Sequence, residues 1–294
     1  MQKNGTMIHA EAEVKINREH KDRLFRLIFG SEENKKNLLA LYNALNDTCY
    51  SEVDDLQITS IEDVIYMGMK NDVSLLIHSR MALYEHQSTY NPNMPIRGMM
   101  YAAKLYEKYI ETNNLNIYGS SLIKLPVPQY VIFYNGSGKH EDEEMLKLSD
   151  AFQTKERIEG YEWTARMLNI NYGRNKVLME KCKPLQDYAI FIDKVKTYIG
   201  QKQPLREAVV RATEECIKED VMAEFLKAHR AEVIDVCITE YNEEKVMDAI
   251  REEGREEGRE ELILNVYKRG KSAEAISDFL DIPLEKVKKI IQKE

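Results

Sequence analysis

The sequence lacks the features that mark membrane-spanning, secreted and zinc-binding chains. None of its apolar stretches approaches the ~20 consecutive apolar residues that a helix needs to cross a bilayer. Residues 1–20 contain no apolar core of the kind found in secretory signals. The four cysteines are scattered without C-x-x-C spacing, which suits buried, reduced thiols better than a zinc site or a disulfide framework. We therefore expect a cytoplasmic protein with no membrane partner.

Charge of neither sign is scarce, but it is unevenly spread. The 294 residues include 42 Lys and Arg and 50 Asp and Glu, a net charge of −8, and 43% of them are hydrophobic. This composition excludes a wholly disordered or collagen-like chain. Residues 243–261 carry nine acidic and four basic residues, whereas residues 15–36 carry seven basic and four acidic ones. Because phosphate contacts depend on local basic surface, the net charge neither excludes nor implies a nucleic-acid partner.

Helix and strand patterns alternate over about the first 200 residues. Two helices are expected between residues 19 and 46, because Leu38, Leu41 and Leu45 share one helical face. Runs rich in branched and aromatic residues predict strands over 63–70, 72–79, 80–87, 130–138 and 161–173. A long helix is expected after Pro95, with an apolar face made by Ile96, Met99, Ala103, Tyr106 and Ile110. Interleaved helices and strands indicate an α/β fold.

No convincing strand follows Pro204. The segment REEGREEGREE (251–261) repeats every four residues, and each glycine costs a helix about 1 kcal/mol relative to alanine. The repeat is therefore either a closely packed helix or a solvated linker. The remaining residues predict short helices in a helix-turn-helix arrangement, which either docks on DNA or forms a small bundle for packing or self-association. The expected parts are an α/β domain over 1–200, a helical segment over 201–250, and the repeat with its helical tail over 251–294.

A pair of carboxylates in the expected hairpin 72–87 is the most informative constellation. Glu85 and Gln87 are two apart on a strand and so share a face. If residues 79–80 form a two-residue turn, position 72 lies opposite 87, and Asp72 and Glu85 are diagonal neighbours on that face. A three-residue turn would shift the register by one and separate them. Two converging carboxylates beside an amide suit Mg²⁺. The alternative is that both are ordinary strand-surface residues.

Several segments together carry a family resemblance. They are KNDVSLLIHSRMALYEHQSTYNPNMPIRGMMYAAKLYEKYI (Lys70–Ile110), YVIFYNG, NINYGRN (Asn169–Asn175), EFLKAHRAEV (Glu224–Val233) and REEGREEG. In combination they resemble the recombination-promoting nuclease and transposase-like family of the PD-(D/E)XK superfamily, over nearly the whole chain. The resemblance implies a restriction-endonuclease-like core, with a mixed central sheet flanked by helices, ahead of the all-helical C-terminal tail. It also implies a DNA endonuclease, linked to recombination or mobile elements, that hydrolyses phosphodiester bonds with Mg²⁺ or Mn²⁺.

The same resemblance assigns roles to the residues of the hairpin. Asp72 and Glu85 match the metal-ligating carboxylates, and Gln87 takes a catalytic position that is lysine in most of the superfamily. Asp22, in the expected first helix, resembles more loosely an additional acid of such sites. A lysine can stabilise charge on the attacking hydroxide or the phosphate, whereas a neutral amide can only hydrogen-bond or help to ligate the metal. We therefore expect the metal to carry more of the catalysis and cleavage to be slow or conditional.

Basic residues after the hairpin suggest a DNA contact. Arg97, Tyr101, Lys104 and Lys108 recur at i, i+4, i+7 and i+11, so they form one stripe of the expected helix. The stripe either follows a phosphate backbone or is a solvated helix face. Arg97 is the member closest to the carboxylate motif.

Three functions remain open from the sequence. The leading one is a metal-dependent DNA endonuclease, with DNA as its partner and Mg²⁺ or Mn²⁺ as its cofactor. The second is a DNA-binding accessory protein that keeps the fold but cleaves poorly, which predicts DNA binding in EDTA without a metal-dependent product. The third is a protein-interaction module that acts, or forms homo-oligomers, through the helical tail, which predicts no affinity for DNA.

Overall fold

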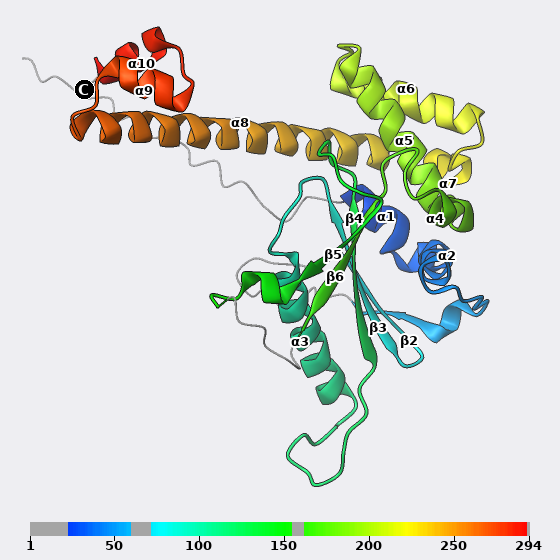
Figure 1. Ribbon diagram of the computed structural model, residues 1–294. Coiled ribbons are helices and arrows are strands. Elements are labelled where there is room, and N and C mark those ends of the chain that lie inside the picture. Colours follow the sequence, from blue (N-terminus) through cyan, green and yellow to red (C-terminus); the bar gives the residue numbers. More distant parts are fainter. Residues whose placement is uncertain (1–22, 60–71, 155–161, 293–294) are drawn as a thin grey trace, which may run out of the picture. The chain divides into compact units, whose positions relative to one another are not determined.

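A central sheet organises the first part of the chain. The computed structural model describes residues 23–59, 72–154 and 162–292 (Figure 1). The strands are β1 (Leu56–Ile58), β2 (Val73–Ile77), β3 (Arg80–Gln87), β4 (Val127–Tyr134), β5 (Glu143–Lys147) and β6 (Thr164–Asn169). Their order across the sheet is β1-β2-β3-β4-β6-β5. β4 runs parallel to both β3 and β6, and the other neighbouring pairs are antiparallel, so the sheet is mixed as expected.

Helices cover both faces of this sheet. The α-helices are α1 (Arg23–Phe29), α2 (Lys35–Asn46), α3 (Met94–Thr112), α4 (Lys176–Lys181), α5 (Lys183–Gly200), α6 (Leu205–Lys218), α7 (Ala223–Ala228), α8 (Arg230–Lys268), α9 (Ala273–Leu280) and α10 (Leu284–Ile291). Parallel strands need a crossover, and α3 with the loop after it connects β3 to β4. α3 lies on one side of the sheet and α1 and α2 lie on the other (Figure 1). In the described ranges, no helix combines the length and the apolarity needed to cross a bilayer.

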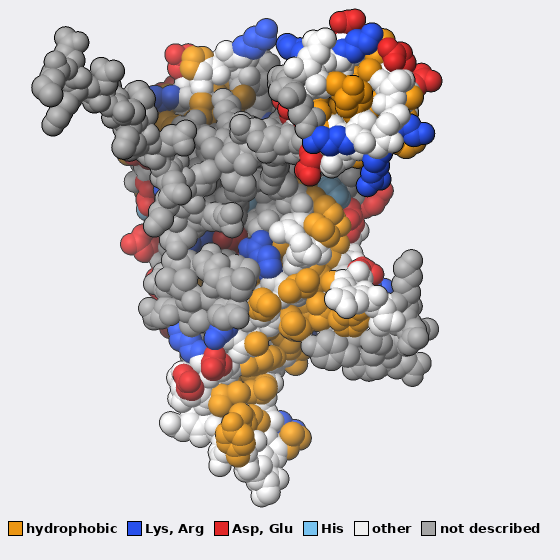
Figure 2. All heavy atoms as spheres, turned by 90° about the vertical axis from the view of Figure 1, so that its left-hand side faces the viewer, with side chains coloured by type: hydrophobic (Ala, Val, Ile, Leu, Met, Phe, Trp, Pro, Cys, Tyr) orange, Lys and Arg blue, Asp and Glu red, His pale blue; other side chains and the backbone are white. Residues whose placement is uncertain are grey.

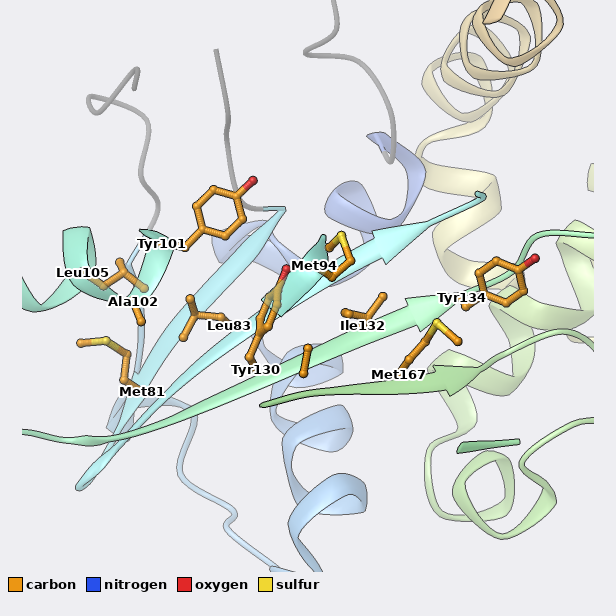
Figure 3. Packing of buried hydrophobic residues seen from close by; sticks show 11 residues of the cluster. Met81, Leu83, Met94, Tyr101, Ala102, Leu105, Tyr130, Ile132, Tyr134 and Met167 are labelled. Atoms are coloured by element: carbon orange, nitrogen blue, oxygen red, sulfur yellow. The ribbon is translucent and has the colours of Figure 1, made fainter. Parts of the chain in front are cut away.

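Two apolar layers follow from the alternation of side chains along the strands. One layer lies under α3 and joins strand residues to the helix; Figure 3 shows part of it, including Met81, Leu83, Tyr130, Ile132 and Met167 from the strands and Met94, Tyr101, Ala102 and Leu105 from α3. In the layer on the other face, the ring of Phe25 packs against Phe133 at 5.1 Å and against Tyr188 at 5.9 Å. The expected helical face of α2 is confirmed, because Leu38, Leu41 and Leu45 are all buried.

The face that α3 turns to the sheet differs from the expected one. Its buried residues are Met94, Pro95, Gly98, Tyr101, Ala102 and Leu105. Of the face expected to be buried, Ala103 is exposed, and Tyr106 and Ile110 line an open hollow of about 520 Å³. The helix carries apolar residues on overlapping stripes, so periodicity alone cannot choose between them. The apolar side chains left outside form a band on this face of the molecule (Figure 2).

The chain divides into two compact units, up to Glu240 and from Tyr241 onward, and each is described by itself. In the first unit, α6 packs on α5 and α7 packs on α6. In the second, the glycine repeat lies inside α8, and the end of α8 packs with α9 and α10 through Ile263, Ile276, Val287 and Ile290. A Cβ atom on Gly258 would meet nothing within 4 Å, so the described part of the repeat is a helix without close packing at this glycine.

Candidate functional site

The β2–β3 hairpin brings the expected carboxylates opposite each other. Its two-residue turn is 78–79, one residue earlier than the expected 79–80. His78 adopts a left-handed φ of 49°, which histidine tolerates better than most residues that carry a side chain. Continued by one step, the ladder sets Asp72 directly across from Glu85. Because the register differs by two positions from the expected one, both carboxylates stay on one face, opposite rather than diagonal.

The two carboxylates have different surroundings. Oδ2 of Asp72 accepts a hydrogen bond of 2.7 Å from the backbone N–H of His86, while Asp72 itself is half-buried. The Glu85 side chain is only 2% exposed, and its Oε1 lies 2.5 Å from Nη2 of Arg97. Nε2 of Gln87 lies 3.5 Å from the same oxygen. One carboxylate is therefore open toward solvent, and the other is neutralised by a partly buried ion pair.

Tyr101 supports the guanidinium of Arg97. The Tyr101 hydroxyl accepts hydrogen bonds from Nη2 of Arg97 at 2.9 Å and from Nε at 3.3 Å. Burial alone would lower the pKa of Arg97, but attraction to Glu85 and to Tyr101 raises it on balance. Burial first, and then the charge of Glu85, raise the pKa of Tyr101 above its usual range. Arg97 is therefore a permanent cation here, and Tyr101 keeps its proton at neutral pH.

β4 adds a second tyrosine that the sequence argument missed. Tyr130 is 4% exposed, and its hydroxyl makes no hydrogen bond within the described residues. Burial raises its pKa well above the usual range, and the charge of Glu85 adds to this effect. Alternation along β4 places Tyr130 and Ile132 on one face. Only the parallel pairing with β3, however, identifies this as the face of Glu85.

The expected basic stripe is divided between the interior and the surface. Tyr101 is buried and Arg97 contacts Glu85, so the hypothesis of a single exposed stripe is wrong for these two residues. Lys104 reaches the surface, where it lies 3.3 Å from Glu107, and Lys108 is exposed. Tyr101 is buried on this face of the helix, but a lysine side chain on the same face is long enough to carry its ammonium group to solvent.

The donor set of the site consists of Asp72, Glu85 and the amide of Gln87. Asp22, the more loosely matched acid, lies outside the described residues, as does the expected strand 63–70. Within the part of the chain that the structure describes, no three His, Cys, Asp or Glu side chains lie together as a metal site. Two carboxylates with an amide oxygen still suit a hard cation such as Mg²⁺, which keeps several of its waters.

The segment NINYGRN fixes loops beside these residues. Nδ2 of Asn169 donates to the carbonyl of His140 at 3.2 Å, and Nδ2 of Asn171 donates to the carbonyl of Gly136 at 3.0 Å. Gln87 aligns with the end of β4, which aligns in turn with Asn169, so these loops lie at the same sheet edge as Gln87. The carboxyl ends of parallel strands are the usual ligand-binding edge of open α/β sheets. We infer a supporting role for this segment.

The chain matches no protein-family model, no curated protein and no solved structure. The family resemblance of the sequence segments therefore stays a prediction. The geometry of Asp72, Glu85, Gln87 and Arg97 is what supports a function for this chain.

Proposed function

We propose that this chain is a metal-dependent DNA endonuclease with a restriction-endonuclease-like core. One observation carries the proposal: Asp72 and Glu85 stand opposite each other on one face of neighbouring strands, with Gln87 within 3.5 Å of Glu85. A glutamate with a side chain only 2% exposed is costly to bury without a cationic partner. Its retention beside a second carboxylate is typical of a functional site rather than of a strand surface.

Asp72 and Glu85 would hold Mg²⁺ or Mn²⁺, with the Gln87 amide as a third oxygen donor. Such an ion, when bound, lowers the pKa of a water and neutralises charge on the phosphate. Gln87 carries no charge, so besides ligating the metal it can act on a water or a phosphate oxygen only by hydrogen bonding. Arg97 and Lys104 are the candidate contacts to the DNA backbone, and each would have to exchange its carboxylate partner, Glu85 or Glu107, for a phosphate.

Nicking of supercoiled plasmid tests the proposal. We expect product with Mg²⁺ or Mn²⁺ and none in EDTA. Asp72→Asn and Glu85→Gln should each lower the rate by at least about a hundredfold, because each removes a charge that the ion requires. Asp235→Asn, on the exposed side of α8, is the matched control and should cleave like the wild-type chain.

The same measurements separate the rival functions. DNA binding in EDTA, without a metal-dependent product under any condition, would identify an accessory protein and overturn the nuclease. No affinity for DNA at low salt would favour the interaction module. Equal cleavage by Asp72→Asn, Glu85→Gln and the wild-type chain would place the chemistry elsewhere.

A further inference from the structure

Arg97 and Glu85 form an ion pair in this structure. The distance between Nη2 of Arg97 and Oε1 of Glu85 is 2.5 Å, and the Arg97 side chain is 24% exposed against 2% for Glu85. Charge pairs at this separation interact more strongly near a protein interior than in water. A divalent cation that approached Glu85 through this oxygen would meet the guanidinium at close range. The two cations therefore compete for one carboxylate.

Tyr101 holds the guanidinium of Arg97 at Glu85, where it would compete with a divalent cation. The Nη2 group of Arg97 has two N–H bonds, and it donates to Oε1 of Glu85 and to the hydroxyl of Tyr101. Nε donates to the same hydroxyl and Nη1 donates to Sδ of Met94, so four hydrogen bonds hold the guanidinium. Buried Tyr101 cannot follow Arg97 outward, because it belongs to the apolar layer under α3. Moving Arg97 off Glu85 thus requires it to leave both partners.

A second observation indicates that the cluster receives a ligand. The side chain of Tyr130 is buried at 4% exposure, its hydroxyl has no hydrogen-bond partner in the described ranges, and the β3–β4 pairing sets Tyr130 on the same face of the sheet as Glu85. A buried hydroxyl without a partner costs free energy, and such groups in native proteins are few. A ligand that enters beside Glu85 would give this hydroxyl a partner.

We propose that Arg97, held by Tyr101, competes with the divalent cation for Glu85, and that cation binding releases the guanidinium to a DNA phosphate. The inference rests on the proposed nuclease function and names a regulation of the same site. Its charge balance is consistent with this order. Asp72 and Glu85 together carry −2, which a divalent cation neutralises, and Arg97 then leaves an excess of +1 that attracts an anion. Metal and DNA should therefore bind cooperatively.

Binding of Mn²⁺ alone, without DNA, tests the competition. Free Mn²⁺ is measured by electron paramagnetic resonance for the wild-type chain, Arg97→Met, Arg97→Lys, Tyr101→Phe and Lys108→Met. We expect Arg97→Met to bind Mn²⁺ about tenfold more tightly, because a charge-assisted hydrogen bond no longer opposes the ion. Tyr101→Phe keeps every charge but loosens Arg97, so it should also bind more tightly, by a smaller factor. Arg97→Lys should remain near the wild type.

Lys108→Met is the matched control, because it removes the same charge from an exposed position on the same helix. If Lys108→Met tightens Mn²⁺ binding as much as Arg97→Met, or if Tyr101→Phe binds like the wild type, the effect is a long-range charge effect and the proposal is overturned. If neither the wild type nor any variant binds Mn²⁺, the metal site itself is absent and the proposed function fails with it. Circular dichroism identifies a variant that does not fold. If Arg97→Met does not fold, the Mn²⁺ affinities of Tyr101→Phe and Arg97→Lys still test the competition.

Binding of a DNA duplex in Ca²⁺ and in EDTA tests the release of Arg97. The ratio of the two affinities should be several-fold smaller for Arg97→Met than for the wild type, and Arg97→Lys should restore it. Equal ratios for Arg97→Met and the wild type would overturn the phosphate contact, while the Mn²⁺ result would still decide the competition.

Discussion

Gly98 on α3 lies against the ring of Tyr130 on β4. A Cβ atom on Gly98 would lie 2.3 Å from Cδ1 and from Cε1 of that ring, whereas Cβ atoms in proteins essentially never come within 3.0 Å of a heavy atom of a non-neighbouring residue. Tyr130 is 4% exposed and lies in the apolar layer under the helix, so its ring has little room to yield. The missing side chain at position 98 therefore allows α3 to approach the sheet. The same approach brings Arg97, the preceding residue, to Glu85.

Gly98→Ala should destabilise the protein, although alanine is the better helix former. Overpacking of this kind costs about 1–3 kcal/mol, which exceeds the gain in helix propensity of about 1 kcal/mol. Urea denaturation measures the change in the free energy of unfolding. The matched control is Gly258→Ala in α8, where a Cβ atom meets open space, so the propensity gain should appear alone. Equal stabilisation by the two substitutions would contradict the close approach at Gly98.

Asp72→Asn and Glu85→Gln should differ in their effect on stability, even though both are expected to abolish cleavage. An asparagine at 72 keeps an oxygen that can accept the N–H of His86, so the free energy of unfolding should change by less than about 1 kcal/mol.

Glu85→Gln instead leaves the guanidinium of Arg97 without its anion in a largely buried position, which should cost about 1–3 kcal/mol. Thermal unfolding of both variants in EDTA checks this order. A larger loss for Asp72→Asn than for Glu85→Gln would contradict it.

Much of the fold could be predicted from periodicity. The α/β alternation, the hairpin and the buried face of α2 follow from the spacing of apolar residues, and the mixed sheet was expected from the family resemblance. The buried face of α3 could not be predicted in this way, because the choice between its overlapping stripes depends on Gly98 meeting the ring of Tyr130. That contact joins residues from different elements, which local sequence patterns do not encode.

The arrangement of the candidate site could be predicted only in part. Glu85 and Gln87 share a face as expected, because strand alternation is local. The position of the turn could not be predicted, because it requires a left-handed φ of 49° at His78. His-Ser is not one of the dipeptides that are typical of two-residue hairpin turns. Arg97 and Tyr101 were expected on an exposed stripe that either follows a phosphate backbone or is a solvated helix face. Their pairing with Glu85 depends on how the crossover helix is rotated about its axis.

The thiols should differ in reactivity at pH 8. Cys49 is exposed, whereas Cys182, Cys216 and Cys237 are buried, so the expectation of buried thiols is confirmed for three of the four. Burial raises the pKa of Cys182 to about 11 and that of Cys216 to about 12. Because the thiolate is the reactive form, a thiol reagent should modify Cys49 rapidly and the buried thiols only on unfolding. Cys49→Ser should remove the fast phase. A second fast thiol in that variant would contradict the burial.

The same pKa values predict how stability changes in alkali. An unfolded cysteine has a pKa of about 8.5, so the folded chain holds the protons of Cys182 and Cys216 more tightly. The sign is therefore fixed: their contribution to stability is complete below about pH 8.5 and is lost as pH rises toward 11–12. Urea denaturation from pH 8 to pH 10 should show a falling midpoint, and Cys216→Ala should show a smaller fall. An unchanged slope in that variant would assign the effect to other groups.

The C-terminal unit should contribute little to DNA affinity. Two of its lysines lie close to carboxylates: Nζ of Lys286 is 3.4 Å from Glu256, and Nζ of Lys288 is 3.4 Å from Glu274. Phosphate contacts require basic charge that is not already compensated, and the acid-rich repeat repels DNA. A chain that ends at Glu240 should therefore bind a duplex within about threefold of the full chain at matched salt, because it loses few phosphate contacts.

Fluorescence anisotropy measures the affinity of the shortened chain, and light scattering measures its oligomeric state in the same buffer. A change in oligomeric state with unchanged affinity would agree with a self-association role for α9 and α10. The full-length double variant Lys286→Ala and Lys288→Ala serves as the control, because it removes the two charges but keeps the helices. A loss of affinity above tenfold in both proteins, at constant oligomeric state, would contradict the prediction. The basic face of α10 would then become the leading DNA contact, and the helix-turn-helix interpretation of the tail would replace the bundle.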